Sequence, residues 1–542
     1  MLVVTTNQND FETDIYSLVK AFYPAAEIKI YLGADAGKEE ISSAPGFPDI
    51  NIYFNGINPA SYDRILIMLY SSENAPEVTG IDIGEAQNRL EIKNALKQLL
   101  YCCLSSHTKI TLPWGALTGI RPVKIPMDLL AKGYGEDEII RKMFDVYFCS
   151  EEKARLALSI AKKEWEILTG IDLENSYSLY ISIPFCPTTC LYCSFTSYPI
   201  EKYKDIVSKY LASLDKEIDF IAGQFGDKRL LTIYIGGGTP TTLSDDMLES
   251  LLKKLKESFD FTHLKEFTVE AGRPDSITFE KLKVMKENYV NRISINPQTM
   301  NEKTLKRIGR NHTPSQVHDA FYLARELGFT NINMDIILGL PGESIDEVNE
   351  TLTAIKNFKP DSLTVHSLSV KRASKLTEWV NENGVGQLNN TIEIMKAASN
   401  CADALGMSPY YLYRQKNTAG NFENVGYAAP GFHGLYNILM MEEVQTIAAL
   451  GAGSVSKRVF AENCSGKSHD SENCHVKSHD SENCHVKRCA QNCHVKRCAN
   501  KNCHVKRRTQ NCHVKRCGNL KEVDQYISRI EEMIERKREL FG

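Results

Sequence analysis

The sequence predicts an α/β protein with a partial (β/α)6 barrel at its centre, an N-terminal α/β module before it and a C-terminal, mostly helical region after it. From Tyr177 onward, short β-branched segments alternate with segments of helical spacing, which is typical of parallel strands covered by helices. Six such units can be counted, whereas a closed barrel would need eight. We therefore expect an open barrel, with functional residues at the carboxyl ends of its strands.

The overall composition favours a globular protein with sizeable cores. The chain has 542 residues, of which 42% are apolar, and a net charge of −4, which does not favour a nucleic-acid partner. Neither a basic and apolar leader nor a run of 18 apolar residues is present, so we expect a cytoplasmic protein without a membrane span. The 16 cysteines, without a secretion signal, favour metal chemistry over disulfides. Nothing in the sequence specifies an oligomeric state.

Residues 1–110 are expected to form the N-terminal α/β module. Ile28–Leu32 and Ile50–Phe54 are predicted strands. Tyr62–Tyr70 and Ala86–Leu104 are predicted helices, the second with apolar residues at helical spacing. The sequence does not indicate a role for this module.

Residues 111–174 are expected to form a linker and a helical segment. Leu112–Ile125 holds Gly, Pro and Trp and is predicted to be a linker or docking loop, and Met127–Leu168 is charged and helical. The later divisions are the barrel at 175–375, a C-terminal substrate-covering region at 376–460, a low-complexity Cys/His/Lys repeat at 461–518 and a terminal helix at 519–542.

Six segments are predicted to be the barrel strands. They are Leu179–Ile183, Leu231–Ile235, Glu266–Glu270, Arg292–Asn296, Ile332–Leu338 and Ser362–Leu368. The residues with chemical potential lie at or just after their carboxyl ends, which is where barrels carry their functional loops.

A cysteine cluster follows the first of these strands. Cys186, Cys190 and Cys193 have C-x3-C-x2-C spacing. Three thiolates hold three irons of a four-iron cubane and leave the fourth open for substrate chemistry, whereas a fourth thiolate would saturate it. The alternative is a zinc knuckle, which would need a fourth Cys or His, and none follows within Ser194–Lys204.

A glycine-rich turn, in the sequence LTIYIGGGTPTT (231–242), follows the second strand. Glycines here permit a ligand to approach the backbone closely, and free N–H groups could bind a carboxylate. The alternative is an ordinary tight turn.

The cysteine spacing, with Tyr192 before the last cysteine, resembles the signature of the radical S-adenosylmethionine (SAM) superfamily. In that family the open iron binds SAM, and the 5′-deoxyadenosyl radical that forms takes a hydrogen atom from substrate. FTVEAGRPD (267–275), RISINPQTMNEKTLKRIGRNHT (292–313) and NMDIILGLPGE (333–343) resemble, in order, the oxygen-independent coproporphyrinogen III oxidases. The resemblance implies a radical SAM barrel, SAM as cofactor and a [4Fe–4S] cluster on the three cysteines.

The same resemblance implies which residues contact SAM. They are Tyr180, Tyr192, Gly237, Gly238, Thr239, Glu270, Gln298, Arg310 and Asp335. Carboxylates can accept from a hydroxyl or an amine, arginine can pair with the SAM carboxylate, and glutamine can both donate and accept. Each charged residue could instead form a surface salt bridge or a helix cap. No catalytic side chain is singled out.

The reaction that the resemblance implies is oxidative decarboxylation of coproporphyrinogen III propionates to vinyl groups in anaerobic porphyrin and haem biosynthesis. An electron donor such as a flavodoxin or ferredoxin would supply electrons to the cluster. Because this tetrapyrrole carries several carboxylates, we expect a basic, aromatic-lined pocket. The candidates are Lys371, Arg372, Arg414, Lys416, Tyr410, Tyr411, Tyr413 and Phe422, and the alternative is a solvated basic loop.

One position departs from the established oxidases, which continue after the third cysteine as Gly-Cys, where this chain has Ser194-Phe195. SFTSYPI, LPWGALTGIRP, YLYRQKNTAGNFENVGY and the N-terminal module resemble instead the HemZ-type, coproporphyrinogen dehydrogenase-like branch. A haem-binding chaperone or haem-transfer protein on the same scaffold is the alternative function. The HNxxYW-type motif of that chaperone branch is not matched by His433-Gly-Leu-Tyr-Asn-Ile.

Near the C-terminus, Asn-Cys-His-Val-Lys recurs at 473, 483, 492, 502 and 511. Between Lys457 and Cys517 there are 14 Lys/Arg against 5 Asp/Glu, so a metal or an anionic partner has to be considered. The spacing alternates between 9 and 10, which fits no zinc-finger register, and few apolar residues are present. We therefore expect a disordered, non-catalytic insertion.

Overall fold

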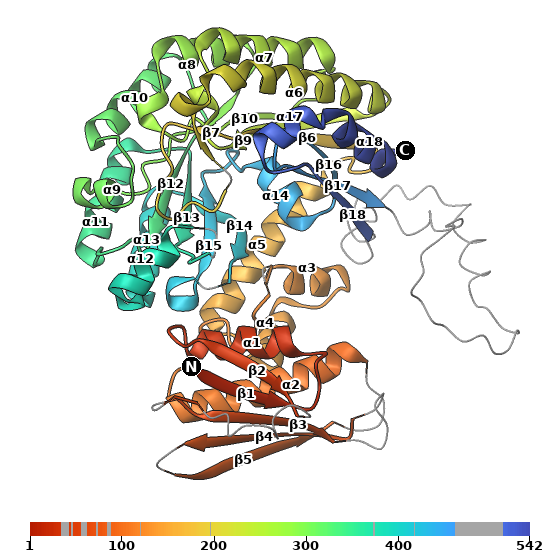
Figure 1. Ribbon diagram of the computed structural model, residues 1–542, viewed down its shortest axis with the longest axis vertical. Coiled ribbons are helices and arrows are strands. Elements are labelled where there is room, and N and C mark those ends of the chain that lie inside the picture. Colours follow the sequence, from red (N-terminus) through yellow and green to blue (C-terminus); the bar gives the residue numbers. More distant parts are fainter. Residues whose placement is uncertain are drawn as a thin grey trace, which may run out of the picture.

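The protein is described here from a computed structural model, which places the N-terminal module at one end and the barrel at the other (Figure 1). The described residues are 1–33, 43–44, 47–55, 62–71, 74–83, 88–119, 121–195, 197–371, 374–416, 418–460 and 513–542.

The N-terminal module is a sheet of order β2-β1-β3-β4-β5 that packs against two helices. Its elements are β1 (Leu2–Thr6), α1 (Glu12–Phe22), β2 (Ile28–Leu32), β3 (Asp49–Asn55), β4 (Arg64–Ser71), β5 (Asn74–Asp82) and α2 (Arg89–Thr108). Its buried apolar residues form a core separate from that of the barrel.

The prediction of a helix at Tyr62–Tyr70 was wrong, because this segment forms β4. Ile65, Ile67 and Leu69 are buried while the residues between them are more exposed, which is the alternation of a strand. β4 pairs antiparallel with both β3 and β5. The segment is mostly apolar, which hides the two-residue alternation of a strand. Its β-branched isoleucines also favour a strand.

The linker segment docks against the barrel. Trp114 is fully buried, and its indole Nε1 donates to Glu423 Oε2 at 2.7 Å. The other carboxylate oxygen of Glu423 accepts from Lys153 Nζ at 2.7 Å. The helices of this segment are α3 (Lys124–Ala131), α4 (Glu136–Tyr147) and α5 (Glu151–Thr169).

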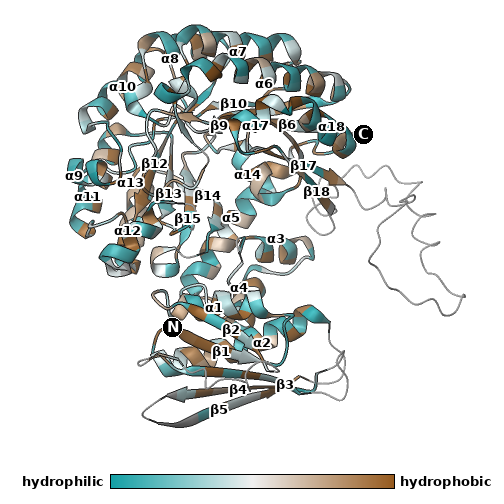
Figure 2. Cartoon of the chain, viewed as in Figure 1, coloured by the Kyte–Doolittle hydropathy of each residue, from teal (hydrophilic) through white to brown (hydrophobic). Residues whose placement is uncertain are grey.

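The predicted barrel strands are confirmed, and they lie side by side in parallel. They are β6 (Ser176–Ile183), β9 (Arg229–Gly237), β10 (Glu266–Val269), β11 (Arg292–Ser294), β12 (Ile332–Leu338) and β13 (Ser362–Ser367). The helices between them are α6 (Lys204–Gln224), α7 (Asp245–Ser258), α8 (Phe279–Glu287), α9 (Glu302–Arg307), α10 (Pro314–Glu326) and α11 (Ile345–Phe358). Figure 2 shows hydrophobic residues along these strands and hydrophilic ones on outer helices such as α7 and α8.

Most of the short elements lie in the loops. They are β7 (Phe185–Cys186), β8 (Tyr198–Pro199) and the 3-10 turns Ile200–Lys202, Pro240–Thr242, Pro274–Ser276, Val385–Gln387 and Ala419–Asn421.

The C-terminal region contains helices, as predicted, and also strands that extend the barrel sheet at both edges. The full sheet order is β14-β15-β13-β12-β11-β10-β9-β6-β16-β17-β18. The helices are α12 (Leu376–Asn383), α13 (Ile392–Ala404), α14 (Leu435–Glu442), α17 (Val523–Ser528) and α18 (Ile530–Phe541). The strands are β14 (Ser408–Arg414), β15 (Glu423–Ala428), β16 (Thr446–Leu450), β17 (Val455–Phe460) and β18 (His513–Gly518).

The end of the repeat departs from the prediction. Residues 461–512, with most of the repeat, lie outside the described residues. Residues 513–518, which we expected to be disordered, form β18 and pair antiparallel with β17. This pairing corrects the predicted boundary, because a strand with few apolar residues depends on a neighbour that the local sequence does not reveal.

The terminal helices are fastened to the barrel by a buried polar network. Lys537 forms an ion pair with Glu217 of α6, and both side chains are almost fully buried. Tyr526 Oη donates to the same carboxylate at 2.7 Å, and Gly451 N donates to it at 2.7 Å. In the part of the chain described here, no helix combines the length and apolar character needed to cross a membrane.

Candidate active site

A cavity of about 660 Å³ opens at the carboxyl ends of the parallel strands, and all the predicted site residues line it. They are Tyr180, Cys186, Cys190, Tyr192, Cys193, Gly237, Gly238, Thr239, Glu270, Gln298, Arg310 and Asp335. Parallel strands bring these residues together because their carboxyl ends share one edge.

The cysteine loop runs from β7 across the mouth of the barrel. Leu191 N donates to Ile308 O at 2.9 Å, which holds the loop against the turn after α9. Burial raises the pKa of Cys186 to about 11. A thiolate at this position therefore needs a neighbouring positive charge, such as a metal, to be stable.

The three thiols do not form a single-ion site in this arrangement. Among the described residues, no three His, Cys, Asp or Glu side chains converge where one metal ion could be held. The ligands of a cubane each bind a different iron and need not converge on one point. Three thiols around one cavity are therefore compatible with a cluster.

The glycine-rich turn packs tightly against the cysteine loop. Gly237 has a φ of +98°, and a Cβ added to Gly238 would lie 2.5 Å from Phe185 O. The expectation that N–H groups here are free was wrong for two of them. Gly238 N donates to Ile183 O and Thr239 N to Phe185 O, both at 2.7 Å, because the turn closes onto the strand beside it.

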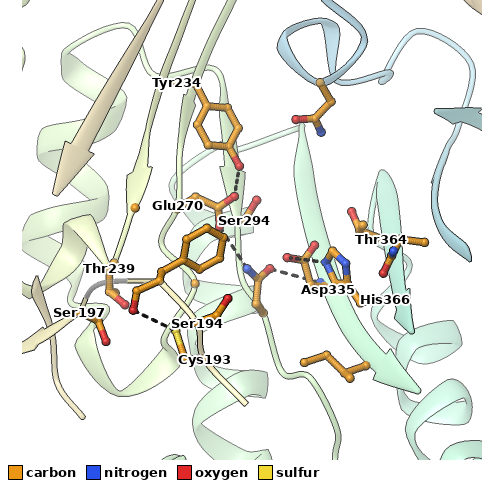
Figure 3. Close-up of a pocket in the computed structure, with 18 of the residues that line it drawn as sticks. Cys193, Ser194, Ser197, Tyr234, Thr239, Glu270, Ser294, Asp335, Thr364 and His366 are labelled. Atoms are coloured by element: carbon orange, nitrogen blue, oxygen red, sulfur yellow. Dashed lines mark hydrogen bonds and ion pairs between the residues drawn. The ribbon is translucent and has the colours of Figure 1, made fainter. Parts of the chain in front are cut away.

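Two carboxylates, Glu270 and Asp335, line the cavity (Figure 3). Tyr234 Oη donates to Glu270, and Asn296 Nδ2 donates to its other oxygen at 3.1 Å. Asn333 donates to Asp335 at 2.6 Å, and His366 Nε2 lies 3.5 Å from its second oxygen. Burial and the charge of Asp335 raise the pKa of Glu270 to about 7. Burial alone would raise the pKa of Asp335, but the hydrogen bond and charge of His366, with Asn333, lower it.

Among the buried polar atoms at this site that lack a partner in the described part of the chain are Gln298 Oε1 and Arg310 Nε. Gln298 has a φ of +65°, a left-handed conformation that is costly for a non-glycine residue. Arg310 is held by Tyr192 Oη at 3.2 Å and by Asn296 O at 2.6 Å. An unpaired acceptor and an unpaired cationic donor suit the amine and carboxylate of an amino-acid ligand such as SAM.

Several cavity residues were missed in the sequence. Tyr234 stacks on Tyr436 with ring centroids 4.6 Å apart, and His366 contacts both Asp335 and Tyr413. Tyr234 and His366 lie within predicted strands at positions facing the cavity, so strand alternation was a usable signal. Arg273 was present in the quoted EAGRPD segment, but its direction depends on the loop that follows β10.

The predicted basic and aromatic pocket is only partly formed. Lys371, Tyr411 and Tyr413 line the cavity, and Lys457 adds a second lysine. Arg414, in contrast, is buried against Trp114 and donates to Leu117 O, because the linker covers this edge of the sheet. Tyr410, Lys416 and Phe422 do not line the cavity, and Arg372 lies outside the described residues.

Comparisons with known proteins agree with this geometry. Residues 180–355 match the model of the radical SAM superfamily. The oxygen-independent coproporphyrinogen-III oxidase-like protein HemZ of Bacillus subtilis is 38% identical over 440 residues, which cover 78% of this chain and 87% of that protein.

Two further relatives match a shorter part of the chain. The haem chaperone HemW of Bacillus subtilis is 40% identical over 198 residues, covering 36% of this chain and 51% of the chaperone. The oxygen-independent coproporphyrinogen III oxidase of Escherichia coli is 31% identical over 192 residues, covering 35% of this chain and 42% of the oxidase. The radical SAM family uses a [4Fe–4S] cluster and SAM, in agreement with the cofactors that the sequence predicts. The chain belongs to the radical SAM superfamily and, within it, to the oxygen-independent coproporphyrinogen-III oxidase-like family of HemZ.

Proposed function

We propose that this protein is a radical SAM oxidoreductase that converts propionate side chains of coproporphyrinogen III to vinyl groups. The observation that carries the proposal is one cavity that combines three cysteines, unpaired groups suited to SAM and a lysine, Lys371. The similarity to HemZ over most of both chains supports the same substrate class.

Cys186, Cys190 and Cys193 would hold the cluster, and Arg310 and Gln298 would hold the amino-acid end of SAM. When bound, the two cofactors supply one-electron reduction and abstraction of a hydrogen atom. Glu270 and Asp335 offer acceptors for hydroxyl or amine groups, and the stacked rings of Tyr180, Tyr234 and Tyr436 line the same cavity. An electron donor such as a flavodoxin or ferredoxin would reduce the cluster.

The substrate would lie on the side of the cavity that carries Lys371, Tyr411 and Tyr413. Lys371 can pair with a propionate carboxylate, and the two tyrosines offer flat apolar surface. Lys457 also lines the cavity, but it is ion-paired with Glu443 at 3.0 Å. Loss of the propionate β-hydrogen atom, then of CO₂ and one electron, leaves the vinyl group. The electron needs a one-electron acceptor, and the chain itself need not supply a proton.

The second candidate function is haem binding, and it is favoured by the similarity of part of the chain to the haem chaperone HemW. A chaperone would need a side chain free to ligate haem iron. His366, the one histidine among the described residues that line the cavity, has both ring nitrogens engaged, with Asp335 and with Tyr413. His366 is therefore not free to ligate haem iron in this arrangement.

Anaerobic reconstitution of the full chain separates the two functions. Incubation with coproporphyrinogen III, SAM and a reductant should give 5′-deoxyadenosine and a product lighter by about 46 mass units per propionate. Mass spectrometry and chromatography would detect both. Tight haem binding, with 5′-deoxyadenosine formation that does not depend on the tetrapyrrole, would instead favour the chaperone.

A further inference from the structure

A buried arginine lies beside the cysteine loop and is not among the residues proposed to contact SAM. Arg273 follows β10, and only 3% of its surface is exposed. It lines the cavity together with the three cysteines.

The guanidinium is fixed by a two-point ion pair. Its Nε donates to Asp275 Oδ1 at 2.9 Å, and its Nη2 donates to Asp275 Oδ2 at 2.7 Å. This fork leaves Nη1 directed at the cysteine loop, where it donates to Thr188 Oγ1 at 3.1 Å and to Cys190 Sγ at 3.7 Å.

Cys190 differs from the other two cysteines in this contact. Cys186 Sγ lies 3.5 Å from Thr239 Oγ1, and Cys193 Sγ lies 3.9 Å from Phe195 O. Among the described residues, neither of these thiols has a cationic hydrogen-bond partner. Cys190 is also the most buried of the three, with 8% of its surface exposed.

A permanent cation donating to a buried thiolate has a defined consequence for an iron–sulfur cluster. Arginine stays protonated in proteins, so its charge is present at every working pH. Hydrogen bonds to the ligand sulfurs and nearby positive charge stabilise the more negative, reduced cluster and raise its reduction potential. Asp275 offsets part of the charge, but it is bonded to the side of the guanidinium that faces away from Nη1.

We propose that Arg273 is a positioning residue that orients Cys190 and raises the reduction potential of the cluster through it. The inference rests on the proposed function only in assigning the cluster to the three cysteines. It does not depend on which tetrapyrrole is the substrate.

The test uses the full chain, reconstituted anaerobically and titrated without SAM or tetrapyrrole. The midpoint potential is followed by electron paramagnetic resonance, and iron and sulfide are assayed in parallel. The principal variant is Arg273→Met/Asp275→Asn, which removes both charges together and so avoids leaving a buried carboxylate unpaired. Arg273→Lys keeps the charge but loses the fork.

A matched control comes from the other end of the strands. Arg325 and Asp361 form an ion pair at 2.7 Å that is partly buried and lies away from the cysteines. Arg325→Met/Asp361→Asn therefore removes an equivalent pair without touching the loop.

We expect the Arg273→Met/Asp275→Asn cluster to have a lower midpoint potential than the parent, the Arg273→Lys cluster an intermediate one, and the control an unchanged one. Equal potentials in loaded parent and loaded Arg273→Met/Asp275→Asn protein would overturn the inference. Failure of both Arg273 variants to bind a cluster that the control binds would also overturn it, in favour of a purely structural role. If the parent holds a cluster but makes no vinyl product, the proposed function fails and the potential shift still decides this inference.

Discussion

The barrel strands place buried polar groups in different surroundings at their two ends. At the amino ends, Glu266 accepts from Leu435 N at 2.6 Å, and Asp361 accepts from Arg325 at 2.7 Å and from Ile332 N at 2.8 Å. At the carboxyl ends, Gln298 and Arg310 each keep a buried atom without a partner among the described residues. Pairing of buried polar groups stabilises a fold, and unpaired groups whose residues line a cavity, as Gln298 and Arg310 do, can be paired by a ligand there. Buried His433 Nε2, near the amino ends, also lacks a partner among the described residues, but His433 does not line the cavity.

The largest effect is expected from a substitution in the cysteine loop, at the carboxyl ends of the strands. Cys186→Ser should abolish the iron–sulfur absorption and 5′-deoxyadenosine formation, because a hydroxyl is a poor ligand for iron in place of a thiolate. Cys401→Ser is the control, since this buried cysteine lies on α13 and contacts Leu352 O. A full cluster in Cys186→Ser would remove this cysteine from the proposed ligand set.

Glu270 should make the carboxyl-end site a source of pH-dependent instability. The pKa of the Glu270 carboxyl is raised from the ordinary 4.5 to about 7 in the folded protein. Between these two pH values the folded state keeps a proton that the unfolded state has already released. Stability is therefore lost as pH rises from about 4.5 to 7, by up to about 3 kcal/mol.

Glu270→Gln should remove this loss, because the amide cannot ionise. Denaturant unfolding at about pH 5 and about pH 8 would measure it, and the variant should lose less stability between them than the parent. An identical loss in both proteins would assign the pH dependence to other groups.

Asp361, at the amino end of its strand, should contribute to stability and not to SAM binding. Asp361→Ala leaves Arg325 and the Ile332 N–H without this acceptor and should lower the free energy of unfolding by about 1 to 3 kcal/mol. Equilibrium unfolding measures this change, while SAM affinity should stay as in the parent. A loss of SAM affinity at unchanged stability would contradict the division between the two ends.

Lys371 tests whether the cavity at the carboxyl ends of the strands binds the substrate. Lys371→Met should weaken binding of coproporphyrinogen III about tenfold, which corresponds to about 1.4 kcal/mol, and the deficit should shrink at high salt. Lys416→Met is the matched control, because Lys416 is exposed and does not line the cavity. Equal losses in the two variants would point to long-range charge and not to a contact in the cavity.

Removal of residues 461–512 should have the smallest effect. Phe460 and His513 are directly opposed in the β17–β18 pair, so an Asn-Gly turn can join the two strands. Iron content and SAM cleavage should match those of the full chain. A loss of cluster on deletion, with the fold intact by circular dichroism, would show that the repeat takes part in metal handling.

Much of the barrel could be predicted from the sequence, because its strands are continuous β-branched runs and its helices are amphipathic. The predicted Ile332–Leu338 coincides with β12, and the predicted site residues all line one cavity. The errors in secondary structure occur where pairing with a neighbouring strand decides the conformation. Tyr62–Tyr70 is a strand because β3 and β5 flank it, and 513–518 is a strand because β17 lies beside it.

The sequence by itself determined the family, the cofactors and the order of the motifs along the barrel, because ligand spacing and hydrophobic period are local properties of the chain. Only the tertiary structure decided where charged side chains point. It buried Arg414 under Trp114, and it aimed Arg273 at Cys190 through the fork with Asp275. The direction of a long cationic side chain depends on partners far away in sequence, and these are brought near only when the strands align.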